Sequence, residues 1–257
     1  MAELKIISWN VNGIRAVVRK GFLSWLDEEK PDILCLQEIK ASENQLTEDI
    51  RKPPGYNVIW NPALRPGYSG TAIFSRLKLT KTEKKLGVKE YDDEGRTIIA
   101  DFGGFMLING YYPNGRSDLS RVSFKLRYYD EVIKKASKLV EGGRNVVLTG
   151  DFNTAHREID LARPAQNVNN TGFLPEERAK MDELIEAGFS DTYRNFHSEP
   201  GNYSWWSYRG GARERNVGWR LDYFFVNKSF MKVVEDSYML PLVKGSDHCP
   251  VVITLKI

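Results

Sequence analysis

The sequence predicts a layered α/β fold in which two β-sheets lie between helices. Short apolar runs rich in β-branched residues, each bounded by turn-forming residues, are typical of buried strands. Longer segments with apolar residues at helical spacing lie between these runs. The first half of the chain has the predicted order strand, helix, strand and then a run of strands, and the second half repeats this general order of elements. This order is typical of helices packed in layers against sheets.

The first predicted elements are a strand at 4–9, a helix at 14–29 and a strand at 32–38. The helix has apolar residues on one face, and Pro31 ends it. The strand from Asp32 to Glu38 is apolar and closes on a carboxylate. Further strands are predicted at 56–60, 70–75, 97–102 and 105–109, with turn residues between them.

The longest helix is predicted at 119–140. Its expected apolar stripe consists of Val122, Leu126, Tyr129, Ile133, Ala136 and Val140. Its expected solvated face carries Lys125, Arg127, Lys134, Lys135 and Lys138. A strand at 145–150 follows, then a helix at 175–187 with Pro175 in its first turn. Strands at 219–226, 233–240 and 251–257 complete the chain.

The composition indicates one globular domain spanning 1–257. The chain is 41% hydrophobic and 28% charged, and it shows no internal repeat, low-complexity tract or linker-like segment. A net charge of +3 permits a polyanionic partner without requiring one. Cys35 and Cys249 have neither metal-ligand spacing nor the pattern of a disulfide framework, so we expect a reducing compartment. The start of the chain lacks a secretory pattern and no apolar run is long enough to cross a bilayer. We therefore expect a cytoplasmic protein without a membrane partner, and a monomer, since nothing indicates an obligate oligomer.

The segment Gly150-Asp151-Phe152-Asn153 directly follows the predicted strand at 145–150. A carboxylate and a carboxamide two residues apart at a strand end can ligate a hard metal, position a water or take its proton. Taken alone, this segment is more often a turn in which both side chains bond the local backbone.

Polar side chains at the ends of other predicted strands favour a functional site. They are Asn10, Asn12, Glu38, Asn109, Tyr111, Asp222 and the segment Ser246-Asp247-His248. Glu38, with amide oxygens and Asp247, offers the oxygen ligands that Mg²⁺ prefers. His248 beside Asp247 or Asp222 offers an oriented imidazole, although a single histidine is more often structural. Because no serine or cysteine nucleophile motif is present, attack by an activated water is the better candidate.

Six segments together resemble the exonuclease III family of abasic-site endonucleases. They are Trp9-Asn10-Val11-Asn12-Gly13, Leu36-Gln37-Glu38-Ile39-Lys40, Tyr111-Tyr112-Pro113-Asn114, Gly150-Asp151-Phe152-Asn153, Asn216-Val217-Gly218-Trp219-Arg220-Leu221-Asp222-Tyr223 and Ser246-Asp247-His248-Cys249-Pro250. The similarity runs in order from residue 4 to residue 257. The shorter segments are shared with the wider endonuclease/exonuclease/phosphatase superfamily. The segment at 216–223, and Glu158-Ile159-Asp160-Leu161 with Asn167 and Asn170, are more specific to the DNA-repair branch.

The resemblance implies a four-layered α/β sandwich, with two mixed β-sheets packed face to face and flanked by helices. It implies Mg²⁺-dependent hydrolysis, with Mn²⁺ as a substitute, of the phosphodiester 5′ to an abasic site in duplex DNA. The products would be a 3′-hydroxyl and a 5′-deoxyribose phosphate. Members of the family differ in 3′→5′ exonuclease activity, 3′-phosphatase activity and incision beside damaged or deaminated bases such as uracil.

The resemblance also implies roles for matching residues. Asp151 would activate the attacking water and Asn153 would orient it. His248, held by Asp222, would stabilise charge on the phosphoryl oxygens. Glu38 would ligate the metal, with Asn10 and Asp247 beside it, and Tyr111 would complete the phosphate site with Asn10. Asp247 would help a second metal or His248. Some relatives have an aspartate where this chain has Asn12, which puts the number of metal ions in doubt.

DNA would be held by an aromatic pocket and by basic residues. The resemblance implies that Trp205, Trp219 and Leu221 wall the pocket for the extruded sugar, with Asn167 and Asn170 as further substrate contacts. Arg209 would enter the DNA stack. Arg116, Arg121 and Lys125 would face phosphates, although simple solvation is equally expected for each of them.

Two other functions are compatible with parts of this pattern. An inositol-phosphate or sphingolipid phosphodiesterase would use the same fold, but the segment around Trp219 and the Gly-rich basic loop at 209–215 argue against it. A catalytically silent DNA-binding module would not need Glu38, Asp151 and His248 together.

Overall fold

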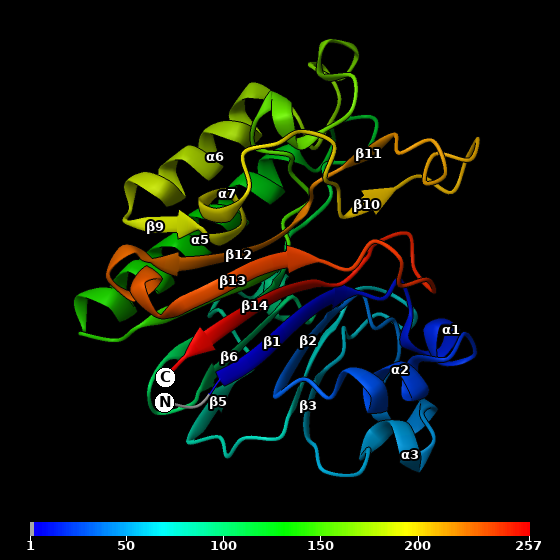
Figure 1. Ribbon diagram of the computed structural model, residues 1–257, viewed down its shortest axis with the longest axis vertical. Helices are drawn as coiled ribbons and strands as arrows, with labels where there is room; N and C mark the ends of the chain where they lie inside the picture. Colours follow the sequence, from blue (N-terminus) through cyan, green and yellow to red (C-terminus); the bar gives the residue numbers. More distant parts are fainter. Residues whose placement is uncertain (1–2) are drawn as a thin grey trace.

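Two six-stranded sheets form the centre of the molecule (Figure 1). The structure is a computed structural model that describes residues 3–257. Met1 and Ala2, at the start of the segment expected to lack a secretory signal, lie outside the described residues. Within residues 3–257, no helix has the length and apolar character that a membrane crossing requires.

The first sheet combines strands from both ends of the chain. Its spatial order is β13 (Val234–Met239), β14 (Val251–Lys256), β1 (Glu3–Asn10), β2 (Ile33–Gln37), β4 (Thr71–Ser75) and β3 (Asn57–Asn61). β1 is parallel to β2 and antiparallel to β14, so the sheet is mixed.

The second sheet is built from the middle of the chain. Its order is β5 (Lys81–Glu83), β6 (Thr97–Asp101), β7 (Met106–Tyr111), β8 (Val146–Asp151), β12 (Asp222–Asn227) and β9 (Phe189–Asp191). β7 and β8 are parallel, and β8 and β12 are antiparallel. A separate two-stranded ribbon joins β10 (Trp205–Trp206) to β11 (Gly218–Trp219).

Helices cover the outer faces of both sheets. Beside the first sheet lie α1 (Ile14–Val18), α2 (Phe22–Glu29) and α3 (Glu48–Arg51). Beside the second lie α5 (Val122–Glu141) and α6 (Pro175–Glu186), with the short α4 (Lys89–Asp92). The short α7 (Thr192–Phe196) contacts β12 of the second sheet and β13 of the first. Short 3₁₀ turns occur at Glu43–Gln45, Glu158–Asp160, Pro164–Gln166 and Lys228–Val233.

The core consists of three apolar layers. Ile6 and Ile73 of the first sheet pack against Leu107 and Val147 of the second. Two further clusters lie between each sheet and its helices. Each fully buried aliphatic side chain contributes about 1.5–3 kcal/mol relative to an exposed one. The predicted four-layered sandwich of two face-to-face sheets is therefore confirmed.

Several predicted boundaries were wrong. The predicted helix at 14–29 is two helices, α1 and α2, because Gly21 takes a φ of 97° between them. The predicted strand at 219–226 is also two, since Trp219 pairs with the ribbon partner Trp205 whereas Asp222 pairs with Asp151. The short β5, β9 and β10 and the helices α3, α4 and α7 were not predicted.

Asn109 was wrongly grouped with the polar residues at strand ends. It is fully buried within β7, and its side-chain nitrogen donates to the carbonyl oxygens of Leu36 and Ala72 at 3.1 and 3.0 Å. Its oxygen accepts a 2.7 Å hydrogen bond from Gln37. Asn109 therefore joins the two sheets and is not available to a substrate.

Lys125 was wrongly assigned to a solvated face and to phosphate binding. Its side chain is fully buried, and its ammonium lies 2.7 Å from Glu177 Oε1 and 2.6 Å from the carbonyl oxygen of Asn153. The buried face of α5 runs through Val122, Lys125, Tyr129, Val132 and Ala136, in alternating steps of three and four residues. Position 125 thus belongs to the buried face of α5, and the carboxylate of Glu177 and the carbonyl oxygen of Asn153 make a buried lysine tolerable there.

We expect Lys125→Met to lower the free energy of unfolding by about 3–5 kcal/mol, because it leaves the Glu177 carboxylate buried without its counter-charge. The double variant Lys125→Met/Glu177→Gln should recover part of this loss, since an uncharged amide is cheaper to bury. Urea unfolding of the three proteins measures both changes. A loss below about 1 kcal/mol in the single variant, the range of exposed ion pairs, would contradict the buried pair.

Candidate active site

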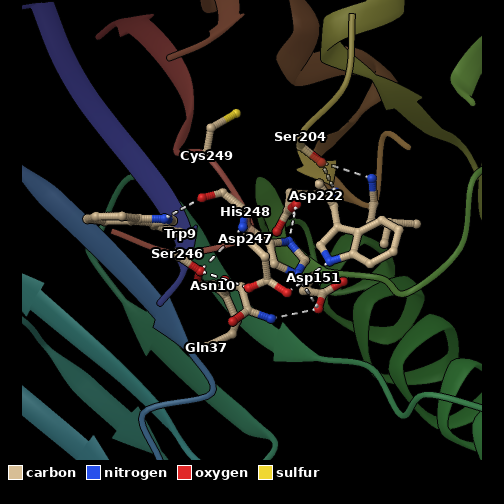
Figure 2. Close-up of polar contacts among 12 residues, drawn as sticks. Trp9, Asn10, Gln37, Asp151, Ser204, Asp222, Ser246, Asp247, His248 and Cys249 are labelled. Atoms are coloured by element: carbon tan, nitrogen blue, oxygen red, sulfur yellow. Dashed lines mark hydrogen bonds and ion pairs between the residues drawn. The ribbon is translucent and has the colours of Figure 1, made fainter. Parts of the chain in front are cut away.

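The ends of six strands meet at one edge of the two sheets. β1, β2, β7 and β8 finish there, while β12 and the residues before β14 start there. The strand register places Asp151 opposite both Tyr111 and Asp222. Polar side chains that are far apart in the sequence are thereby brought into one cluster (Figure 2).

Asp151 lies at the centre of this cluster and is buried. Its Oδ2 accepts a 2.8 Å hydrogen bond from Asn10 Nδ2, and its Oδ1 accepts one of 2.8 Å from the backbone N–H of Asn153. Burial raises the pKa of Asp151 to about 7; Asp222 and Glu38 add to the rise and His248 opposes it. A carboxylate with such a pKa can accept a proton near neutral pH.

Asn153 is held in a left-handed backbone conformation, with φ 50°. Its side-chain nitrogen donates to the carbonyl oxygen of Tyr112 at 2.9 Å and to Asp151 Oδ2 at 3.2 Å. Its oxygen accepts from Asn114 at 3.1 Å. The buried ammonium of Lys125 donates to the carbonyl oxygen of Asn153. Asn153 is thus fixed from several sides next to the carboxylate.

His248 lies between Asp222 and Asp151 (Figure 2). Its Nδ1 is 2.8 Å from Asp222 Oδ2, and its Nε2 is 3.9 Å from Asp151 Oδ2. Burial alone lowers the pKa of His248, but Asp222 and Asp151 outweigh it and raise the pKa to about 10. A pKa of about 10 keeps the ring protonated at neutral pH, and His248 lines the pocket described below.

Hydrogen bonds also fix the backbone that carries Asp222 and His248. Ser204 Oγ accepts from the backbone N–H groups of Leu221 and Asp222 at 2.9 and 3.0 Å. Trp9 Nε1 donates to the carbonyl oxygen of His248 at 3.1 Å. Ser204 was not predicted, because its hydroxyl acts on the backbone of a residue 18 positions away.

Glu38 is linked to Asp151 through the side chain of Asn10. Asn10 Nδ2 donates to Glu38 Oε1 at 2.9 Å as well as to Asp151, so one amide holds the two carboxylates together. Burial acts to raise the pKa of Glu38, but Lys40, Asn10 and Tyr111 outweigh it and lower the pKa. Burial and the charge of Glu38 raise the pKa of Tyr111, which keeps its hydroxyl protonated.

Glu38 and Asp151 fit a divalent cation best among the predicted ligands. They are ionisable carboxylates held by one amide, and Glu38 lines the pocket described below. Asn10 presents its nitrogen to both of them, and its oxygen accepts from the backbone N–H of Asn12 at 2.9 Å. Asn10 therefore orients the two carboxylates. Asp151, Asp222 and His248 also lie close enough to share an ion, but the short His248–Asp222 contact makes them a hydrogen-bonded array.

A cavity of about 360 Å³ opens beside the cluster. Trp205, Trp219 and Leu221 line it, together with Glu38, Tyr111, Asn114, Asn153, Thr171, Gly172, Asp247 and His248. The two indole rings stand nearly perpendicular, at 84°, with their centroids 6.3 Å apart. A Cβ at Gly172 would come within 3.2 Å of the Trp219 ring, which explains the glycine. Asn114, Thr171 and Gly172 were not predicted, since each depends on a neighbour far along the chain.

The other predicted DNA contacts lie outside this cavity. Arg116, Arg209 and Asn170 are exposed, and Asn167 is half-buried with its Oδ1 accepting from Asn170 at 2.9 Å. Arg209 lies on a loop where Gly210 and Gly211 have positive φ. Arg121 is half-buried and bonded to Glu94 at 3.0 Å. The interactions of these residues with DNA stay predictions.

We expect the His248 ring of the metal-free protein to remain doubly protonated at pH 8. The folded pKa, about 10, lies above the ordinary value of 6.5. The ion pair therefore contributes its full stability below pH 6.5 and loses it as the pH rises through about 10. Asp222→Asn should lower the pKa of His248. Nitrogen NMR of the ring measures this, with His156, whose pKa burial lowers, as the internal neutral control. A neutral His248 ring at pH 8 in the unmutated protein would contradict the assignment.

Comparisons with known proteins find relatives that match nearly the whole chain. Residues 7–248 match the model of the endonuclease/exonuclease/phosphatase family. An exodeoxyribonuclease of Bacillus subtilis is 45% identical over 99% of this chain and all of its own length. The zebrafish (Danio rerio) DNA repair nuclease APEX1 is 40% identical over the whole of this chain and 83% of its own.

Solved structures show the same similarity. An AP endonuclease from Archaeoglobus fulgidus has a TM-score of 0.90 and 32% identity, covering 99% of this chain and 100% of its own. A Neisseria 3′ phosphatase bound to a product DNA hairpin has a TM-score of 0.89 and 27% identity, with the same coverage.

Proposed function

The chain belongs to the endonuclease/exonuclease/phosphatase family, and we propose that it is a DNA-repair nuclease that hydrolyses the phosphodiester 5′ to abasic sites in duplex DNA. Family membership and its full-length relatives make it a metal-dependent hydrolytic nuclease. The observation that supports the finer proposal is the position of Asp151. It lies between an imidazolium and a second carboxylate, beside a pocket walled by two tryptophans.

Each residue of the site has a separate role in the hydrolysis. Asp151, with its raised pKa, takes a proton from a water that attacks the phosphorus, and Asn153 orients that water. The P–O bond to the 3′-oxygen breaks and the departing oxygen takes a proton from solvent water, which leaves a 3′-hydroxyl and a 5′-deoxyribose phosphate. His248 faces the growing charge on the phosphoryl oxygens as an imidazolium, and Asp222 keeps it charged and oriented. Tyr111 is protonated and can donate to the same phosphate.

We propose Mg²⁺, with Mn²⁺ as a substitute, as the metal. Glu38 would hold it by its carboxylate oxygens, the ligand type that Mg²⁺ prefers, which leaves Asp151 free to take the proton. When bound, such an ion neutralises charge on the transferred phosphoryl group. We infer that the whole chain acts as one catalytic domain, because the cluster takes residues from both sheets and from both ends of the chain.

The pocket provides the selectivity for abasic sites in this proposal. Its volume falls within the range of about 300–1,000 Å³ of pockets that enclose a small organic molecule, and an extruded nucleotide is such a molecule. An abasic nucleotide has already lost its stacking, so it costs little to extrude. Trp205, Trp219 and Leu221 present apolar surface to the sugar, and Arg116 and Arg209 are exposed where a duplex can reach them.

We expect Asp151→Asn to lower the rate of abasic-site incision by about 10²- to 10⁴-fold, because the amide cannot take the proton. Incision of a labelled duplex with one abasic analogue measures the rate, with and without Mg²⁺. Asp27→Asn, on a side chain 84% exposed on α2, is the matched control and should retain full activity. The proposal is rejected if the unmutated protein with Mg²⁺ leaves the duplex intact.

We also expect a ranked preference among substrates: abasic duplex first, uracil-containing duplex second and undamaged duplex last. The reason is the increasing cost of extruding the nucleotide and of fitting a base between Trp205 and Trp219. Parallel single-turnover reactions on the three duplexes and a 3′-phosphate end give the order and test the other activities of the family. Equal rates on abasic and undamaged duplexes would identify a non-specific nuclease.

A further inference from the structure

A continuous chain of side-chain contacts links Glu38 to the wall of the pocket. Lys40 Nζ lies 2.6 Å from Glu38 Oε2 and donates to Asn12 Oδ1 at 2.5 Å. Asn12 Nδ2 donates to Asp247 Oδ1 at 2.9 Å, and Trp205 Nε1 donates to Asp247 Oδ2 at 3.0 Å. We call Lys40, Asn12, Asp247 and Trp205 the strut. It spans the site from the best-fitting metal ligand to an aromatic wall.

Asn12 determines which groups donate and which accept hydrogen bonds along the strut. A carboxamide can accept from an ammonium with its oxygen and donate to a carboxylate with its nitrogen, whereas an aspartate at this position could only accept. The backbone of Asn12 is fixed as well, with φ 46° and its N–H donating to Asn10 Oδ1. Both the oxygen and the nitrogen of the Asn12 amide are therefore hydrogen-bonded.

Asp247 has both carboxylate oxygens committed. Oδ1 accepts from Asn12 and, at 3.2 Å, from Ser246 Oγ, and Oδ2 accepts from Trp205. A cation at Asp247 would share these oxygens with the three donors that orient the carboxylate. The Lys40 ammonium already supplies positive charge between Glu38 and Asn12.

The backbone of Trp205 is fixed independently of the strut. It pairs with Trp219 in the ribbon and forms a bridge with His248, and the next N–H, of Trp206, donates to the carbonyl oxygen of Asp247 at 3.0 Å. The half-buried indole is held by its hydrogen bond to the Asp247 side chain. Its orientation in the pocket wall therefore depends on that carboxylate.

We propose that Asn12 is a positioning residue that makes Asp247 the anchor of the Trp205 wall and withholds it from a second cation. This replaces the expectation that Asp247 assists a second metal. The strut keeps the wall at a fixed distance from Trp219, and so determines how strongly the pocket favours a bare sugar over a nucleotide that carries a base. The selectivity part rests on the proposed function; the anchoring part does not.

The anchoring is tested by fluorine NMR of protein labelled with 5-fluorotryptophan. The Trp205 resonance is assigned by its loss in Trp205→Phe. In metal-free Asn12→Asp, two adjacent carboxylates repel and the Trp205 resonance should shift or broaden. In Asn12→Asp/Asp247→Asn the polarity is reversed, because the amide at 247 donates to residue 12 and accepts from Trp205, so the original resonance should return. Asn57→Asp, at an exposed position on β3, is the matched control without effect.

The same proteins test the withheld cation site. Titration with Mn²⁺, followed by electron paramagnetic resonance, counts bound ions. Asn12→Asp should bind one ion more than the unmutated protein, and the exchanged double variant should return to the original number. Equal numbers in all three proteins would overturn this part of the proposal.

Selectivity is measured as the ratio of kcat/KM on abasic and uracil-containing duplexes. A tenfold change in this ratio corresponds to about 1.4 kcal/mol. We expect Trp205→Phe, which removes the hydrogen bond to Asp247, to lower the ratio by about tenfold. If the Trp205 resonance is unchanged in Asn12→Asp, the strut is overturned whatever the enzyme cleaves. If the resonance responds but no abasic duplex is cut, the proposed function fails and the anchoring stands.

Discussion

The burial of one imidazole between two carboxylates is the constraint on which the site depends. Asp151 and Asp222 face each other across β8 and β12, and both are nearly inaccessible to water. Two buried negative charges in register would be strongly unfavourable alone. His248 makes the arrangement possible as a cation, and the carboxylates in turn keep it charged. The charges of His248 and Asp151 therefore depend on each other.

This constraint explains why the surrounding polar residues are so thoroughly bonded. Ser204 and Trp9 fix the backbone that carries the dyad, while Asn10 and Asn153 satisfy the oxygens of Asp151. The same edge of the sheets carries the pocket, because β11 leads into the segment that holds Asp222 and Trp205 of β10 forms a bridge with His248. The charged residues and the wall of the pocket therefore lie at the same group of strand ends.

The sequence was informative where a residue's role follows from local pattern. Most strands were predicted because buried strands are short apolar runs, and the strand-end residues Glu38, Asp151 and His248 were singled out for the same reason. The predictions for Lys125 and Asn109 were wrong because a polar residue is expected at the protein surface. Only the tertiary partners of these two side chains reveal that they are buried. Likewise the direction in which the Asn10 amide points is decided by Glu38, Asp151 and Asn12, not by its own strand.

Backbone strain supports the conclusion that these loops are built for chemistry. Asn12, Glu38, Lys40 and Asn153 all have φ between 46° and 52°, a conformation that costs a non-glycine residue about 1–3 kcal/mol. Glycine at these positions would remove the strain but also the side chains that hold the carboxylates and the strut. The fold therefore bears this cost next to the site, and the dense hydrogen bonding of the same residues offsets it. Strain and bonding together leave each side chain a single orientation, which is what a site that must place a water, a phosphate and a metal requires.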